Sequence, residues 1–291
     1  MPSLGAAKRR HVLVPFLVLA ALLLSACEQY LAPPGDGQVR YRDLLFASTT
    51  RTADISYGTA VDQQGATVEL RLDVYQPVGD TVTSRPLVVF VHGGSFCCGN
   101  KSSPEIVDEA TTLAREGFVT ASISYRLAPG GCTGSVPIEV CVTAIVHARE
   151  DAQAAIRFLR TNAADYGIDP TRVAIAGTSA GAITAVNVAF SSSDDPTAAV
   201  RAGISLSGAA LTSTPNAGDA PVFLMHGTAD GLVPYAWAVN TRDMAIAAGV
   251  RVAMTTWEGA GHVPYTQHRT EILEQTRNYL WWHLDLANAA T

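Results

Sequence analysis

The segment GTSAG, Gly177–Gly181, places a serine between two glycines, after the apolar run RVAIAG and before the run AGAITAVNVAF. These runs predict a strand followed by a helix, joined by a turn sharp enough to project the Ser179 side chain from the edge of a sheet. Only glycine avoids collision at the flanking positions of so tight a bend. A serine that merely caps the helix is the alternative, but a cap would not require both glycines. The pattern therefore predicts that Ser179 is a nucleophile.

A serine hydroxyl is a poor nucleophile until a neighbouring base takes its proton. We expect that base to be a histidine in another loop after a strand. His262, in WEGAGHVPY, lies in a glycine-flanked loop after the last expected strand. His92 belongs to a glycine turn, and His226 ends a strand, where a packing role is expected. The remaining histidines fall in the leader or in helical stretches, namely His11, His147, His268 and His283. His262 is therefore the predicted base.

The imidazole needs an acid to fix its tautomer and to stabilise its positive charge. Asp230, in HGTADGLVP, follows the preceding expected strand and lies in a turn, between glycines and before a proline. An aspartate in a turn is more often only a turn former. Its place in the chain order serine, aspartate, histidine favours the catalytic interpretation. Asp219 is the competitor, but it precedes its strand and would lie at the wrong edge of the sheet.

Attack on a carbonyl carbon builds negative charge on the oxygen, which needs N–H donors that already point toward it. The residue after the nucleophile, Ala180, supplies one donor at a helix N-terminus. The sequence VHGGSF, Val91–Phe96, follows another expected strand, and its glycines let main chain approach a ligand closely. Gly94 and Ser95 are therefore predicted to complete an oxyanion hole. This chemistry requires neither a metal nor an organic cofactor, and we expect none.

The elements that must position these residues follow an alternating order. Two stretches of alternating polarity, 53–61 and 67–77, predict an antiparallel hairpin joined at Gly65. Continuous apolar runs then predict buried strands at 87–92, 118–125, 172–177, 201–208, 220–227 and 250–259. Helices are expected at 103–115, 147–167, 180–190, 236–248 and a final segment ending in NYLWWHL. The order predicts an α/β fold: a mostly parallel, twisted sheet of about eight strands with helices on both faces.

Together these motifs resemble the α/β-hydrolase family, close to its carboxylesterases and lipases. HGGSF is similar to the HGGG-type loop, GTSAG to the nucleophile elbow, HGTADGLVP to the acid loop and GAGH to the histidine loop. The resemblance covers nearly everything from the first hairpin to the final helix, and it implies an α/β-hydrolase fold. One departure is Ser95, which stands where many members of the family have a third glycine.

Only 11 residues, 209–219, separate two of the expected strands at the point where many relatives insert a lid. We therefore expect no large lid domain, with some cover from the 130–141 loop. The predicted triad, the family resemblance and the open cleft together indicate a serine carboxylesterase. We expect it to act, through an acyl-enzyme, on short-acyl or aromatic-acyl esters, either small or linked to a polymer. A prolyl-oligopeptidase-type peptidase is the alternative, because HGTAD, VPY and GAGH also resemble those enzymes. A hydrolase-fold binding protein without turnover usually lacks a member of the triad, and none is missing here.

Residues 1–26 have the pattern of a secretory signal, with three basic residues before a 13-residue apolar run. LSAC resembles the lipobox of bacterial lipoproteins, which predicts that Cys27 is lipidated; an ordinary cleaved signal is the alternative. A Pro/Gly-rich tether at 27–40 would then join the anchor to a single catalytic domain at 41–291. We expect an extracytoplasmic protein that contacts the membrane only through its lipid, in an oligomeric state that the sequence leaves open.

Loss of the leader removes three basic residues and no acidic ones. Of the 20 basic residues 17 then remain against 26 acidic residues, so the formal charge falls from −6 to −9. An acidic chain of this kind is a poor partner for the phosphates of nucleic acids. We therefore expect no nucleic-acid binding.

Four cysteines remain beyond Cys27, namely Cys97, Cys98, Cys132 and Cys141. Outside the cytoplasm an even number suggests two disulfides, with three pairings open. Their spacing does not fit the usual zinc motifs. The strand order of the family implies that the two cysteine-bearing loops meet at the catalytic edge. This leads to the hypothesis that cross-loop disulfides hold the oxyanion turn, with a purely structural role for the bridges equally open.

Overall fold

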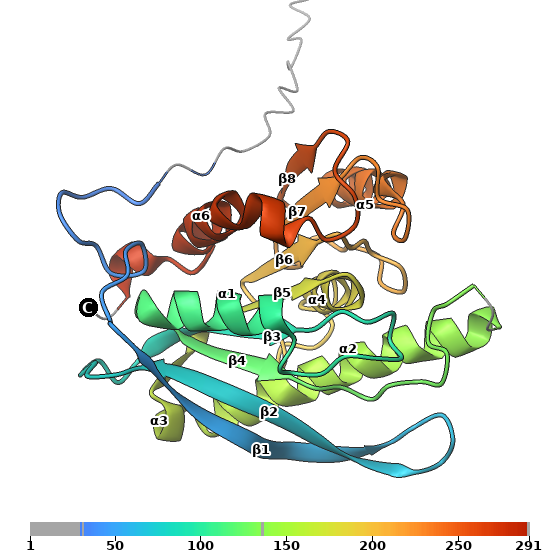
Figure 1. The fold of residues 1–291 in the computed structure, drawn as a ribbon, viewed down its shortest axis with the longest axis horizontal. Helices are drawn as coiled ribbons and strands as arrows, with labels where there is room; N and C mark the ends of the chain where they lie inside the picture. Colours follow the sequence, from blue (N-terminus) through green and yellow to red (C-terminus); the bar gives the residue numbers. More distant parts are fainter. Residues whose placement is uncertain (1–29, 31, 135–136, 290–291) are drawn as a thin grey trace, which may run out of the picture.

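The computed structural model describes residue 30 and residues 32–134 and 137–289. In this part of the chain eight strands form one sheet in the order β1-β2-β4-β3-β5-β6-β7-β8 (Figure 1). The strands are β1 (Thr49–Val61), β2 (Thr67–Pro77), β3 (Arg85–Val91), β4 (Val119–Ile123), β5 (Ile168–Thr178), β6 (Ala202–Leu206), β7 (Val222–Gly227) and β8 (Val252–Trp257). The helices are α1 (Pro104–Arg115), α2 (Ile138–Thr161), α3 (Ala163–Tyr166), α4 (Ala180–Ala189), α5 (Tyr235–Ala247) and α6 (Tyr265–His283), followed by a short 3-10 turn at Leu286–Asn288.

The sheet is antiparallel at one edge and parallel everywhere else. β1 pairs with β2 as the predicted hairpin, whose turn contains Gly65 at φ +83°. β2 pairs antiparallel with β4, and the pairs from β4 through β3 and β5 to β8 are all parallel. The predicted mostly parallel sheet of eight strands is confirmed. The carboxyl ends of β3, β5, β7 and β8 consequently meet at one edge, where ligands bind in sheets of this type.

Helices cover both faces of the sheet (Figure 1). Each face carries its own apolar core. Helices α1 and α6 pack on one face, where Val88, Phe90 and Ile204 point. Helices α2, α4 and α5 pack on the other, against Val89 and Val91. Alternate residues of β3 thus enter opposite cores, which explains why this strand is apolar at every position. Two packed layers hold the strands rigidly enough to serve as a frame for loops.

The connection between β6 and β7, residues 207–221, contains no helix or strand. The sequence prediction that no lid domain is inserted here is confirmed. None of the helices in the described part of the chain combines the length and the apolar character that crossing a membrane would require.

The chain that precedes β1 lies against the domain. Tyr41, the first residue of the predicted catalytic domain, is fully buried, with its ring 5.0 Å from that of Phe118. Tyr30, within the predicted tether, hydrogen-bonds through its hydroxyl to His283 Nε2 at 2.7 Å. Cys27 and the predicted leader lie outside the described residues.

Candidate active site

Ser179 lies in a strained turn between β5 and α4. Its φ of +54° belongs to the left-handed region, and its N–H donates to Leu206 O at 2.9 Å. A Cβ on Gly181 would lie 2.0 Å from Val91 O, and one on Gly177 would lie 2.5 Å from the carbonyl carbon of Gly181. Both contacts are far closer than van der Waals distance, so side chains cannot be accommodated. The predicted steric need for two glycines is confirmed, and it explains how a buried strand can end in an accessible hydroxyl.

The structure brings the three predicted residues together in one chain of hydrogen bonds. Ser179 Oγ lies 2.8 Å from His262 Nε2, and His262 Nδ1 lies 2.8 Å from Asp230 Oδ2. The Asp230 side chain has no exposed surface, whereas that of His262 is 17% exposed. The carboxylate accepts from Nδ1–H, which leaves Nε2 free to accept the serine proton. In this geometry a base contacts the nucleophile, and an acid contacts the other ring nitrogen of the base.

The acid loop and the histidine loop are fastened to each other. Ala229 N–H donates to Ala260 O at 2.9 Å, and Gly259 N–H donates to Thr228 Oγ1 at 2.8 Å. Next to His262, Val263 has φ +45°, a costly conformation for a β-branched residue. Its N–H donates to the buried Ser207 Oγ at 3.0 Å, which holds it there. The strained backbone of Val263 therefore helps to fix the position of the adjacent imidazole.

The carboxylate of Asp230 accepts hydrogen bonds on both of its oxygens. Its Oδ1 accepts the N–H groups of Leu232 and Val233, each at 2.9 Å, and its Oδ2 accepts His262. Burial by itself would raise the pKa of Asp230, but these hydrogen bonds outweigh burial and lower the pKa below its ordinary value. Asp230 is thus ionised at neutral pH, as a partner for a protonated imidazole must be.

The competing Asp219 has a different place. Its carboxylate accepts Ser193 N–H at 2.9 Å, Ser193 Oγ–H at 2.7 Å and Asn216 N–H at 2.8 Å. It therefore closes a turn away from the imidazole.

The glycine turn after β3 lies directly against the nucleophile. A Cβ on Gly93 would lie 3.2 Å from Ser179 Cβ, and one on Gly94, at φ +116°, would lie 2.1 Å from Cys98 O. Ser95 has φ +51°, a conformation that favours glycine, which accounts for the third glycine of many relatives at this position. No acceptor from the described residues engages the N–H of Ser95 or of Ala180. Main-chain donors are thus available beside Ser179.

His92 supports this turn from beneath. It is fully buried, stacks on Tyr125 with ring centroids 4.3 Å apart, and its Nδ1 lies 2.6 Å from Gly93 O. Burial lowers the pKa of His92 to about 4, although the Gly93 carbonyl opposes the shift. The ring is therefore neutral at physiological pH. Its role is to hold the turn, in keeping with its assignment to the glycine turn.

The hypothesis of cross-loop disulfides is wrong. Cys132 and Cys141 form a disulfide with each other, and Cys97 and Cys98 are free thiols whose sulfurs lie 2.8 Å apart. The two loops do meet, because Cys132 N–H donates to Ser95 O at 2.8 Å. Main-chain hydrogen bonds, and not disulfides, therefore link the two loops. Residues Ser95 and Phe96, directly before the adjacent cysteines, both have positive φ, a loop conformation that the sequence pattern does not reveal.

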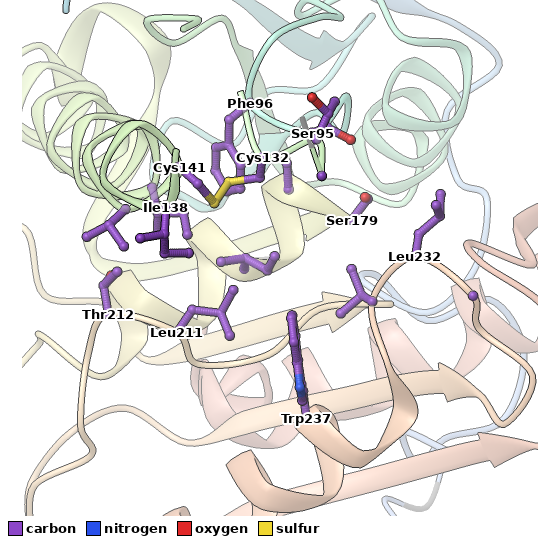
Figure 2. A pocket seen from close by; sticks show the side chains of 18 residues that line it. Ser95, Phe96, Cys132, Ile138, Cys141, Ser179, Leu211, Thr212, Leu232 and Trp237 are labelled. Carbon is purple, nitrogen blue, oxygen red and sulfur yellow. A yellow bond between two sulfur atoms is a disulfide. The ribbon is translucent and has the colours of Figure 1, made fainter. Parts of the chain in front are cut away.

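A pocket of about 660 Å³ opens next to Ser179. Figure 2 shows the Cys132–Cys141 disulfide, Ile138, Leu211 and Trp237 around the same hollow as the Ser179 side chain. The disulfide loop supplies part of the wall, as expected for the 130–141 segment. The sequence could not identify these residues, because they come from five separate segments of the chain.

His226 is the residue beside the triad that sequence reasoning missed. It was expected only to pack, and it is fully buried, but its Nε2 lies 3.1 Å from Asp230 Oδ2. The four-residue spacing of HGTAD was the available signal, because a turn that tight returns the aspartate toward the end of the strand.

The other described histidines have structural contacts. His268 stacks on Trp257 at 4.5 Å, and His283 contacts Tyr30 and Tyr279. His147 lies within α2, as predicted.

The fold and the site geometry define an α/β-hydrolase fold that carries a serine–histidine–aspartate arrangement at the carboxyl edge of its sheet. Two family models match overlapping parts of the chain: the BD-FAE model matches residues 72–201, and the Phospholipase/Carboxylesterase model matches residues 147–279. Both matches agree with the α/β-hydrolase fold of the structure, and the second is to a model described by the name of carboxylesterases.

Curated relatives include a probable isoprenylcysteine alpha-carbonyl methylesterase of Oryza sativa subsp. japonica, 31% identical over 60% of this chain and 35% of its own length. Carboxylesterase NlhH of Mycobacterium tuberculosis is 36% identical over 33% of this chain and 26% of its own length. Phenmedipham hydrolase of Pseudarthrobacter oxydans is 37% identical over 34% of this chain and 19% of its own length. The matched region spans about a third or less of each of these relatives.

Solved structures share the fold at lower sequence identity. Propionate-bound esterase 2 of Thermogutta terrifontis has a TM-score of 0.62 and 23% identity, over 80% of this chain and 96% of its own. A truncated carbohydrate esterase from gut microbiota has a TM-score of 0.63 and 19% identity, over 84% of this chain and 98% of its own.

Proposed function

We propose that this protein is a serine carboxylic-ester hydrolase in which Ser179, His262 and Asp230 form the catalytic triad. The observation that carries the proposal is the pair of 2.8 Å contacts that joins the three side chains beside an open pocket. The esterases among the relatives and the family-model matches support the same class of reaction.

In the first half-reaction Ser179 Oγ forms a bond to the ester carbonyl carbon while its proton moves to His262 Nε2. The carbonyl electrons move onto the oxygen, which the N–H groups of Gly94, Ser95 and Ala180 would stabilise. Collapse of the tetrahedral intermediate breaks the carbon–oxygen bond of the ester, and the leaving alkoxide takes the proton from His262. The alcohol departs and an acyl-enzyme remains on Ser179.

In the second half-reaction a water molecule takes the place of the alcohol. His262 Nε2 accepts a proton from the water as its oxygen bonds to the acyl carbon. Collapse returns that proton to Ser179 Oγ and releases the carboxylic acid. Asp230 stays ionised throughout and stabilises each imidazolium as it forms.

We assign the pocket to the acyl group on the basis of its position relative to the triad. The leaving oxygen must reach His262 Nε2 to receive its proton, so the alcohol lies on the histidine side of Ser179. The described residues that line the pocket include Ser95 and Ala180 but not His262. Its apolar lining favours short-acyl or aromatic-acyl groups, with the alcohol directed toward solvent.

An ester panel that varies the acyl and alcohol groups separately tests this assignment. Replacing Trp237, which is 45% exposed at the pocket, with alanine is expected to change the acyl preference and leave the alcohol preference unaltered. Trp282→Ala is the matched control, because that side chain is 53% exposed on α6, away from the pocket. A Trp237→Ala variant that alters the alcohol preference instead would reverse the assignment. Aminoacyl anilides in the same panel test for peptidase activity.

We also propose that Cys27 carries a lipid that anchors the protein outside the cytoplasm. The LSAC sequence after the apolar run supports this. Metabolic labelling with a fatty-acid analogue should mark the wild type but not Cys27→Ala. Label on the Cys27→Ala variant, or no label on the wild type, would contradict lipidation of Cys27.

A further inference from the structure

His226 is a second histidine on the carboxylate of Asp230. It lies at the end of β7, four residues before the aspartate, with its ring fully buried. Its Nε2 lies 2.9 Å from Val233 O and 3.1 Å from Asp230 Oδ2. One ring nitrogen therefore faces two acceptors, both belonging to the acid loop.

The acceptors determine which nitrogen of His226 carries the hydrogen. A main-chain carbonyl oxygen can only accept, so Nε2 must be the donor. Nδ1 is buried without a hydrogen-bond partner among the described residues, and a proton there would be a buried, unsatisfied donor. Burial lowers the pKa of His226, against the opposing effects of the Val233 carbonyl and the Asp230 carboxylate. The ring is thus neutral, with its hydrogen on Nε2.

This hydrogen completes the shell of donors around a carboxylate that water does not reach. Oδ1 of Asp230 accepts two main-chain N–H groups, and Oδ2 accepts the hydrogen of His262. The Nε2–H of His226 donates to Val233 O and also lies 3.1 Å from Oδ2. Each donor fixes the orientation of the carboxylate and takes up part of its charge. Without His226, His262 would be the one side chain near Oδ2, among the described residues, that interacts with its negative charge.

We propose that His226 is a positioning residue of the triad, which locks the rotamer of Asp230 and limits how strongly that carboxylate attracts a protonated His262. The proposal rests on the proposed function, because it assigns His226 a role in the same proton transfer. The described titratable groups that face His226 are Asp230 from its own loop, His262 from the loop before α6, and Tyr235 from α5, whose ring lies 5.9 Å away.

Two substitutions separate this role from simple packing. His226→Leu fills the site without a donor, and His226→Gln restores an N–H near the position of Nε2. With a butyrate ester, we expect the acid limb of the kcat/KM profile of His226→Leu to move to higher pH by roughly half to one unit, so that activity near pH 6 falls by about three- to tenfold. His226→Gln should return the limb to the wild-type position.

Phe223→Leu is the matched control, because Phe223 is a buried residue of β7 that contacts Tyr279 on the opposite face of the sheet. It should lower the melting temperature and leave the pH profile unchanged. A folded His226→Leu with the wild-type acid limb would overturn the proposal and leave His226 as packing.

A measurement on the wild type holds even if His226→Leu does not fold. Nitrogen-15 NMR of histidine-labelled protein should show one ring that stays neutral and Nε2-protonated at neutral pH and whose signals are absent in His226→Gln. A His226 that is Nδ1-protonated or charged at neutral pH would refute the proposal. Failure of the proposed function looks different: the wild type would hydrolyse no ester, whatever the tautomer of His226.

Discussion

Gly94→Ala places a methyl group where the structure has no room for one. A Cβ at Gly94 would lie 2.1 Å from Cys98 O and 2.6 Å from the carbonyl carbon of Cys98. Ordinary carbon–oxygen contacts begin near about 3.3 Å, so the turn must shift by about 1 Å. That shift breaks the hydrogen bonds, 3.0 Å each, that Cys97 and Cys98 donate to Gly94 O, and it displaces the N–H groups of Gly94 and Ser95.

Misplacing an oxyanion donor by about 1 Å typically costs about 100- to 1000-fold in kcat. We expect a loss of that size for Gly94→Ala with p-nitrophenyl butyrate, with a smaller change in KM and a retained circular dichroism spectrum. Gly79→Ala is the control: its φ is also positive, at +82°, but a Cβ there meets nothing within 4 Å. It should cost about 1 kcal/mol of stability and no activity. A folded Gly94→Ala with kcat within about threefold of wild type would refute the oxyanion assignment.

Two further predictions concern stability and sulfur chemistry. Burial, with smaller contributions from neighbouring carboxylates, raises the pKa of Glu109 to about 8, so the folded state binds a proton that the unfolded state releases above its ordinary pKa of 4.5. The contribution of Glu109 to the free energy of unfolding is therefore fully present below about pH 4.5 and is lost as pH rises toward 8. Glu109→Gln should raise the melting temperature at pH 8, by the equivalent of about 2–4 kcal/mol, and leave it nearly unchanged at pH 4.5. Equal gains at both pH values would contradict this. Peptide mapping of non-reduced protein should find Cys132 linked to Cys141 and both Cys97 and Cys98 alkylated, whereas any link between the two pairs would contradict the structure.

Much of the site could be predicted because its requirements are local. Gly177 and Gly181 are demanded by the turn itself, so their spacing around Ser179 identifies the elbow in the sequence. The alternation of buried strands with helices then places His262 and Asp230 at the same edge of the sheet. These inferences need only the chain order and the direction of each strand.

The rest depends on how loops fold back, which no local pattern encodes. His226 reaches Asp230 only because the intervening turn reverses within four residues. The cysteine pairing depends on how the two loops fold, because Cys132 pairs with Cys141 within its own loop and leaves Cys97 and Cys98 as free thiols. The pocket lining depends on five segments that converge only in the folded chain.

The most direct test of the central claim is to find the atom that becomes covalently modified. Wild-type protein treated with a fluorophosphonate should gain one label, which tandem mass spectrometry places on Ser179, and should lose ester hydrolysis in proportion to labelling. Ser179→Ala should gain no label and hydrolyse no ester above background, while His262→Ala should fold and label far more slowly. A label on another residue, or hydrolysis that persists in folded Ser179→Ala, would contradict the account.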